Sequence, residues 1–158
     1  MNFTSKFLTN IGWLKVVGSY DFIESASFTT KEPIIKKSDA LWEEKLFKQL
    51  TIYFNYQKIE FDLPLKPKGT DFQLRVWSEI KSVPHGQTIT YKELSERMKH
   101  PKAIRAIAAA NSKNPILLFI PCHRIIGQNG KLVGYSAGIN RKEFLLNLEN
   151  GIVSNQLF

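Results

Sequence analysis

A cysteine, a histidine and an arginine stand side by side in this chain, at Cys122, His123 and Arg124, directly after Pro121. A thiol attacks as its thiolate, and a neighbouring base or positive charge favours that form. Glu143 could orient His123 and complete a Cys–His–Glu arrangement. The alternative is structural: Cys122 is then a small buried apolar side chain, His123 a hydrogen-bonded histidine and Glu143 a helix cap.

The composition predicts a globular intracellular protein. Hydrophobic residues make up 43% of the chain and charged residues 23%, which excludes a disordered or fibrous class. The single cysteine excludes an internal disulfide and a multi-cysteine zinc site, and it indicates a reducing compartment. We expect neither a signal peptide nor a membrane span, because no apolar run is long enough.

Positive charge is concentrated in the second half of the chain. Residues 1–66 contain nine Lys and Arg against eight Asp and Glu, whereas residues 67–158 contain thirteen against six. Basic charge confined to one half favours a polyanion such as nucleic acid as the partner of that half. The alternative is a merely solubilising surface.

Residues 1–66 predict a small sheet followed by one helix. Three segments rich in β-branched and aromatic residues are expected to be strands: 3–8, 13–18 and 22–29. Apolar residues at helical spacing between Leu41 and Phe54 predict a helix capped by Ser38. The extended segment Asp62–Gly69 predicts a linker. Because no catalytic constellation precedes it, we expect this unit to be a scaffold.

Residues 67–158 predict a helical domain with a helix-turn-helix. Three capping boxes mark expected helix starts: Thr70 with Gln73, Thr90 with Glu93, and Asn140 with Glu143. Pro101 suits the first turn of a further helix, whose outer face would carry Lys102, Arg105, Ala109 and Ser112. Two short helices with a tight connection, the second basic and poor in bulk, are typical of a DNA-binding helix-turn-helix.

The segment around Cys122 predicts extended structure. The short apolar run Ile116–Ile120 is bounded by prolines and predicts a buried strand or an extended segment. The Asn-Gly pair within Gly127–Gly130 predicts a hairpin between the apolar pairs on either side. If Cys122 and His123 were on a strand, they would point to opposite faces, so His123 could reach the thiol only across a turn or through a water.

The sequence Ile120–Ile125, IPCHRI, resembles the active-site signature of the O6-alkylguanine-DNA alkyltransferases, the methylated-DNA–protein-cysteine methyltransferase family. The similarity continues, in order and spacing, through these blocks: 69–73, 76–77, 90–94, 105–107, 114–115, 134–136 and 142–146. It covers nearly all of residues 69–149. Residues 1–66 resemble the family only in their sheet-plus-helix plan.

This resemblance implies an α/β (α+β) fold with two domains. Residues 1–66 would form a small sheet-plus-helix domain, similar to RNase H. Residues 67–158 would form a helical, winged-helix-like helix-turn-helix domain that binds DNA and carries the active-site cysteine.

The resemblance also implies a DNA repair function. Members of the family transfer the alkyl group from O6 of guanine, and less readily from O4 of thymine, to the signature cysteine, which stays alkylated, so each molecule acts once. The implied partner is double-stranded DNA containing O6-alkylguanine. The protein would act as a cytoplasmic monomer without a cofactor, a metal or a membrane.

Individual roles follow from the motifs. Cys122 would be the acceptor, His123 a base acting through a water, and Glu143 the residue that orients His123. Tyr91 would polarise the base ring. The substrate-binding residues are expected to be Ser136, Tyr135, Ile125 and Asn114. The DNA-binding residues are expected to be Arg105, Lys102, Ala106, Ala109 and Arg124.

Two other classes remain open from the residues alone. A cysteine hydrolase could use Cys122, His123 and Glu143, but it would turn over and would not need a basic helix. A helix-turn-helix regulator would use the basic helix without needing the thiol. Leu117 stands where certain family members have a proline that walls the pocket, which leaves the acceptance of bulky adducts open.

Overall fold

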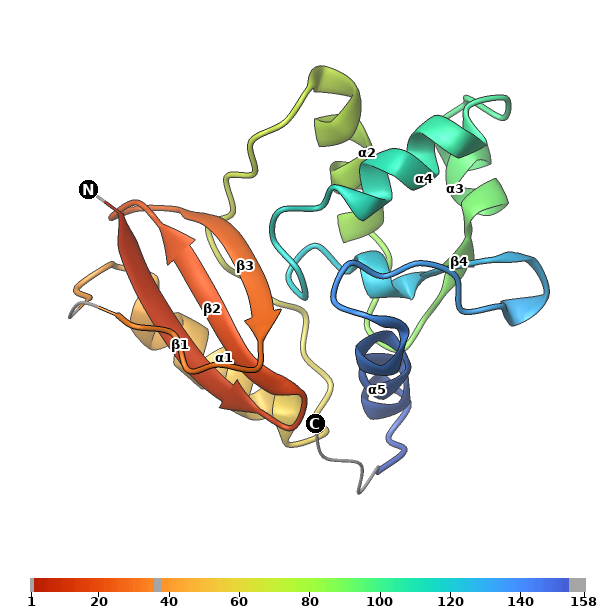
Figure 1. Cartoon of the computed structure of the whole chain (residues 1–158). Coiled ribbons are helices and arrows are strands. Elements are labelled where there is room, and N and C mark those ends of the chain that lie inside the picture. Colours follow the sequence, from red (N-terminus) through yellow and green to blue (C-terminus); the bar gives the residue numbers. More distant parts are fainter. Residues whose placement is uncertain (1, 36–37, 154–158) are drawn as a thin grey trace.

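An antiparallel sheet and one helix form the first part of the structure, a computed structural model that describes residues 2–35 and 38–153. The strand order is β1-β2-β3, and helix α1 covers one face of the sheet (Figure 1). The bounds are β1 Phe3–Thr9, β2 Gly12–Gly18, β3 Ile23–Thr29 and α1 Glu43–Phe54. The sheet-plus-helix plan predicted for this half is confirmed.

The second part is mostly helical. Helix α4 packs against both α2 and α3, and α3 with α4 forms the predicted helix-turn-helix (Figure 1). Trp77 fixes α2 to α4 by donating its indole N–H to the Ala110 carbonyl at 2.8 Å. The elements are α2 Asp71–Lys81, β4 Ile89–Thr90, α3 Tyr91–Arg97, α4 Ile104–Ser112, η1 Cys122–Arg124, β5 Ile125–Ile126, η2 Gln128–Gly130 and α5 Ile139–Glu149.

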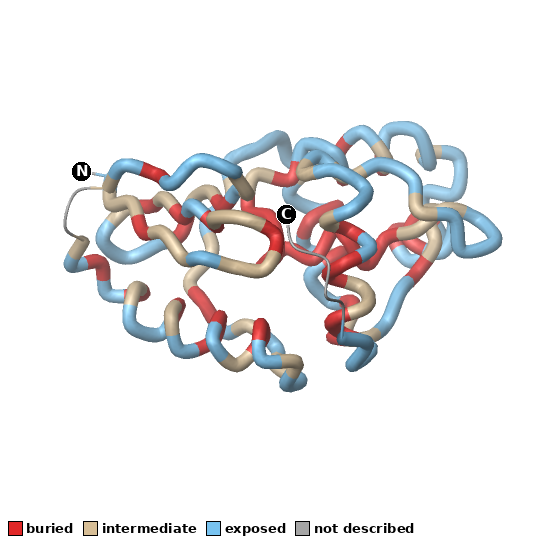
Figure 2. Tube along the Cα trace, turned by 60° about the horizontal axis from the view of Figure 1, so that its bottom comes forward, coloured by how far each residue is buried: buried red, intermediate tan, exposed pale blue. Residues whose placement is uncertain are grey.

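The two halves share one hydrophobic core. Buried positions are concentrated where the sheet meets the C-terminal helices (Figure 2), and one cluster of buried apolar residues extends from Ile11 to Leu148. Strand β3 forms bridges to Leu65 in the connecting segment and to Ile116 in the segment that leads to Cys122. The sheet therefore holds the approach to Cys122, while the division at residue 66 stays a prediction.

Two of the predicted local structures near Cys122 are wrong. Residues 116–120 are buried, but they form a turn with a single bridge to Ala26 instead of a strand. Asn129 and Gly130 do have the positive φ angles of an Asn-Gly turn, 60° and 75°. No hairpin forms there, because β5 pairs in parallel with β4.

Helix starts follow the predictions at two positions. Thr70 and Gln73 form a complete capping box, and the Thr90 hydroxyl accepts from the Glu93 N–H. The prediction for the last helix is wrong, since α5 begins after Gly138. Helix α1 likewise begins after Trp42 instead of Ser38.

Replacing Thr70 by alanine is expected to lower the free energy of unfolding by about 1 kcal/mol, because the N-cap hydroxyl of α2 is lost. Chemical denaturation measures this difference. Thr51→Ala is the matched control, since Thr51 is exposed inside α1 and alanine is the better helix former there. Equal losses in the two variants would contradict the capping role.

Candidate active site

A cavity of about 370 Å³ lies between helix α4 and the loop that precedes α5. Its wall contains the thiol of Cys122 together with apolar and small side chains. The lining residues are Tyr91, Ile104, Arg105, Ala108, Asn111, Ser112, Cys122, Val133, Gly134, Tyr135 and Ser136. The cavity therefore joins four predicted site residues, Cys122, Tyr91, Tyr135 and Ser136, to the predicted DNA-contacting Arg105.

Cys122 is held at the start of a 3-10 turn, η1, and is 3% exposed. Its N–H donates to the Ile120 carbonyl at 2.8 Å. Asn114 braces the same turn, because its amide donates to the Ile120 carbonyl at 2.8 Å and accepts from the Ile116 N–H at 2.9 Å. Asn114 itself does not line the cavity, so its contacts are those of a brace.

His123 lies behind the cysteine, fully buried. Its Nε2 lies 2.7 Å from Oε1 of Glu149. An ionised carboxylate only accepts, so Nε2 donates, and in the neutral ring Nδ1 has no proton. Nδ1 is buried without a hydrogen-bond partner, which makes it an available proton acceptor next to Cys122 in the sequence.

The residue that orients His123 is Glu149, and the assignment of Glu143 to this role is wrong. Glu143 is exposed near the start of α5, whereas Glu149 is 8% exposed at its end. Glu149 follows Leu145 by four residues and so lies on the buried face of α5. A charged residue on that apolar stripe was the available signal for its role.

Arg124 is also misassigned as a DNA-binding residue. It is 3% exposed and directs two guanidinium nitrogens, Nε and Nη2, at the two oxygens of Glu149, each at 2.9 Å. Its Nη1 donates to the Val83 carbonyl at 2.7 Å. This fork locks the carboxylate in the position from which it holds His123.

Burial sets the protonation states of the site. Burial raises the pKa of the Cys122 thiol to about 11, although a hydrogen bond from Asn114 and the charge of Lys142 oppose the shift. Burial likewise lowers the pKa of His123 against the opposing pull of Glu149. Burial would raise the pKa of Glu149, but the charge and hydrogen bonds of His123 and Arg124 lower it well below its usual range. At neutral pH the cysteine is a thiol beside a neutral imidazole.

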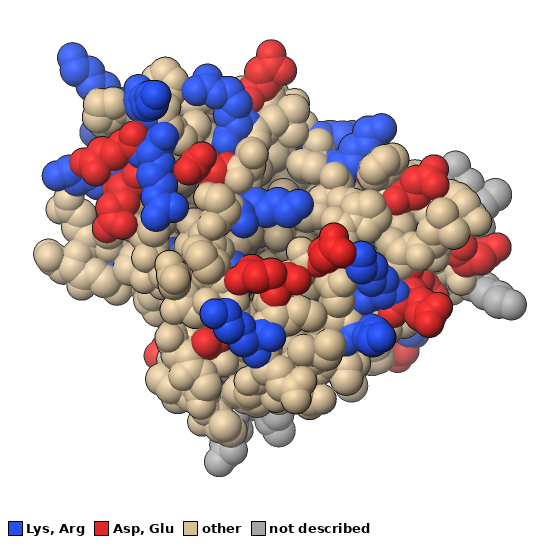
Figure 3. All heavy atoms as spheres, turned by 180° about the vertical axis from the view of Figure 1, so that it is seen from behind, with Lys and Arg blue, Asp and Glu red and all other residues tan. Residues whose placement is uncertain are grey.

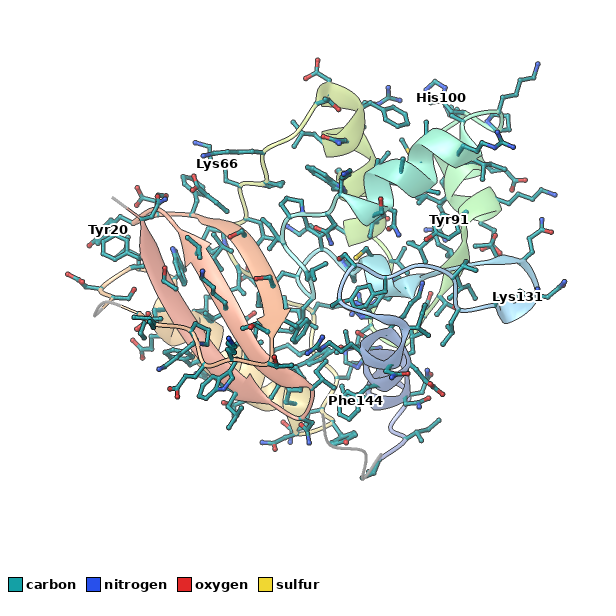
Figure 4. The ribbon with its side chains drawn as sticks, viewed as in Figure 1. Tyr20, Lys66, Tyr91, His100, Lys131 and Phe144 are labelled. Carbon is teal, nitrogen blue, oxygen red and sulfur yellow. The ribbon has the colours of Figure 1, made fainter. Side chains whose placement is uncertain are left out.

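Tyr91 lines the cavity with a hydroxyl that can donate. The Asn111 amide donates to this hydroxyl at 3.0 Å, which leaves the phenol proton free. Burial raises the pKa of Tyr91, so the phenol is protonated at neutral pH. Figure 4 shows Tyr91 at the base of α3, with Lys131 at the outer end of the neighbouring loop. Sequence reasoning did not identify Asn111, which is buried on α4.

A buried lysine holds the loop that completes the cavity. The Lys142 ammonium donates to the carbonyls of Ile125, Val133 and Gly134, at 2.6, 3.1 and 3.3 Å. Ile125 itself is buried outside the cavity wall, so only its carbonyl could contribute to substrate binding. Sequence reasoning did not identify the role of Lys142.

Three of the predicted DNA-binding residues of the helix-turn-helix lie on α4, and the fourth, Lys102, precedes that helix. Lys102, Arg105, Ala106 and Ala109 are all exposed, and Arg105 lies at the cavity wall. Figure 3 shows the molecule from behind, and on that face basic side chains gather over the helical C-terminal half, with acidic groups among them. Because the alanine side chains are small, the backbone of α4 can approach a DNA groove closely.

Comparison with known proteins places this geometry in a family. Residues 71–151 match the family described as 6-O-methylguanine DNA methyltransferase, DNA binding domain. The methylated-DNA–protein-cysteine methyltransferase of Methanosarcina acetivorans is 40% identical over 148 residues, which cover 90% of this chain and 95% of that protein. The chain belongs to the methylated-DNA–protein-cysteine methyltransferase family.

Solved structures agree with this assignment. The crystal structure of the Mycobacterium tuberculosis O6-methylguanine methyltransferase has a TM-score of 0.85 and 36% identity, covering 99% of this chain and 97% of that chain. The structure of the Mycobacterium tuberculosis OGT in complex with DNA has the same score and identity, covering 95% and 94%. The predicted family and fold class are confirmed.

None of the helices in the described ranges is long and apolar enough to span a membrane. Within residues 2–35 and 38–153, no three His, Cys, Asp or Glu side chains are grouped so that they could hold a metal ion.

Proposed function

We propose that this methyltransferase repairs double-stranded DNA by moving the alkyl group of O6-alkylguanine, and less readily that of O4-alkylthymine, onto Cys122. The observation that carries the proposal is the cavity itself, which brings the thiol, the Tyr91 hydroxyl and Arg105 together beside the helix-turn-helix. The protein would act as a cytoplasmic monomer.

The reaction would run as a single displacement. The thiol proton passes to Nδ1 of His123, directly or through a water, while sulfur bonds to the alkyl carbon and the bond from carbon to O6 breaks. Guanine takes up one proton as it leaves and His123 releases the proton that it received from the thiol, so the number of protons is conserved. Tyr91 would stabilise the leaving base by hydrogen bonding. The thioether would not pass its alkyl group on, because a thiolate is a poor leaving group from an alkyl carbon, so the protein would act once.

DNA recognition would require the base to leave the stack. The alkylated oxygen is out of reach inside a duplex, and flipping the nucleotide costs a few kcal/mol. Arg105, at the wall of the cavity, is planar and long enough to fill the vacated space. Ser136 and Tyr135 would then contact the flipped base. Affinity would come mainly from phosphates, as expected for α4 in the minor groove.

Titrating the protein with a duplex that contains one O6-methylguanine tests the proposal. The number of guanines restored should rise to one per protein and stop, even with lesion in excess. Restoration of many guanines per protein would indicate a turning-over hydrolase. Binding without any restoration would indicate a recognition or regulatory protein.

Replacing Arg105 by alanine is expected to slow transfer by roughly 10-fold to 100-fold, since an empty stack no longer offsets the few kcal/mol of flipping. Single-turnover kinetics at saturating duplex measure this rate. Lys102→Ala is the matched control. It should weaken DNA binding and reduce the slope of log affinity against log salt concentration by about one, the effect of one lost phosphate contact, without slowing transfer at saturating duplex. The assignment fails if Arg105→Ala transfers at the wild-type rate.

A further inference from the structure

Tyr53 extends the network around His123 into the N-terminal half of the chain. Its hydroxyl donates to Oε1 of Glu149 at 2.7 Å. The same oxygen accepts from Nε2 of His123 at 2.7 Å and from Nη2 of Arg124 at 2.9 Å. The phenol and the imidazole therefore share one carboxylate oxygen.

The position of Tyr53 is fixed by burial and aromatic packing. It lies near the end of α1, is fully buried, and packs against Phe54, Phe61 and His85, with ring centroids 5.1, 5.1 and 5.6 Å away. The end of α1 faces the α5 side of the molecule (Figure 1). Such a hydroxyl has little freedom to turn from Glu149.

The hydrogen bond from Tyr53 affects how Glu149 acts on His123. The phenol O–H withdraws negative charge from Oε1 and fixes the orientation of the carboxylate. Glu149 therefore attracts the proton on Nε2 less strongly. Without this donor, the bond between Glu149 and His123 would strengthen and His123 would be harder to deprotonate. Charged and titratable groups that face this network from the other packed elements are Cys122, Arg124, Tyr135, Lys142, Glu60 and His85.

We infer that Tyr53 is a positioning residue for alkyl transfer, acting through Glu149 to keep Nδ1 of His123 unprotonated and correctly aimed at the thiol proton. The inference rests on the proposed function. It assigns part of the reaction machinery to the N-terminal half, which the sequence predicts to be only a scaffold.

The test is the rate of methyl transfer at saturating O6-methylguanine duplex, measured across pH for Tyr53→Phe and wild type. The phenylalanine keeps the packing and removes only the hydroxyl. The variant should be about tenfold slower at neutral pH, the effect of losing one hydrogen bond to a charged group. The acidic limb of its pH–rate profile should move upward by roughly half a pH unit, and the affinity for DNA should not change.

Phe54→Leu is the matched control, because it loosens the same cluster and keeps the hydroxyl. It should lower the melting temperature without moving the acidic limb. If the acidic limb of the pH–rate profile is unchanged in Tyr53→Phe, whatever the transfer rate of that variant, the inference is overturned. An equal shift of the acidic limb in Phe54→Leu also overturns it. If Tyr53→Phe does not fold, a fluorinated tyrosine placed at residue 53 donates more strongly and should move the limb to lower pH, and no movement overturns the inference.

The wild-type sample separates this inference from the proposed function. Wild-type protein that transfers no methyl group overturns the proposed function, and the inference with it. Wild-type transfer together with a Tyr53→Phe profile identical to wild type overturns only the role of Tyr53.

Discussion

Replacing Cys122 by alanine is expected to abolish alkyl transfer and leave binding to alkylated DNA intact. The sequence contains one cysteine, which lines the cavity, and its thiol is the proposed nucleophile. Alanine removes a single sulfur atom from a buried position, so we expect a stability loss on the order of 1 kcal/mol. Single-turnover transfer and duplex affinity, measured on the same preparation, check both halves of the prediction.

Cys122→Ser is the closest control in shape. Its hydroxyl is a far weaker nucleophile than a thiol, so this variant should also fail to transfer while it binds DNA. Transfer by either variant would show that another residue receives the alkyl group.

Replacing Glu149 by glutamine is expected to slow transfer by roughly 100-fold, the usual contribution of a correctly held general base. The amide offers one acceptor where the carboxylate offers two, so the imidazole of His123 and the guanidinium of Arg124 compete for it. We also expect a stability loss of about 3–5 kcal/mol, because the buried charge of Arg124 loses its partner. Transfer kinetics and thermal unfolding measure the two effects.

Glu143→Gln is the matched control, since Glu143 is an exposed glutamate on the same helix. It should transfer at the wild-type rate and unfold at the wild-type temperature. Loss of transfer in Glu143→Gln, with Glu149→Gln unaffected, would restore the assignment made from the sequence.

The stabilising effect of Glu149 should depend on pH. Its pKa is lowered in the folded protein, so the stability it contributes is present above the unfolded value of about 4.3 and is lost as pH falls below it. The melting temperature of wild type should therefore decrease through this acidic range more steeply than that of Glu149→Gln. Parallel slopes would mean that the carboxylate does not carry the predicted shift.

The fold was predictable where local patterns decide it. Alternation and turn residues predicted the three strands, and the Thr70–Gln73 capping box predicted the start of α2. The turn of residues 116–120 was not predictable, because its buried apolar run has the composition of a strand. What bends it is the side chain of Asn114, which bonds to Ile116 and Ile120 at once.

The site was predictable in its cysteine and histidine but not in their partners. Asn140 and Glu143 resemble a capping box, and this resemblance concealed that α5 begins after Gly138 and that its buried face ends at Glu149. The neighbouring residues in the sequence suggest that Arg124 is a surface cation. Its side chain is instead buried, in an ion pair with Glu149. Tyr53 lies 96 residues from Glu149, a separation that no local pattern spans.

The most direct test of the central claim is the intact mass of the protein after incubation with excess O6-methylguanine duplex, followed by peptide mapping. Each molecule should gain one methyl group in place of one hydrogen, located on Cys122, while one guanine is restored. Restored guanine with an unchanged protein mass, or a methyl group on another residue, would contradict the account.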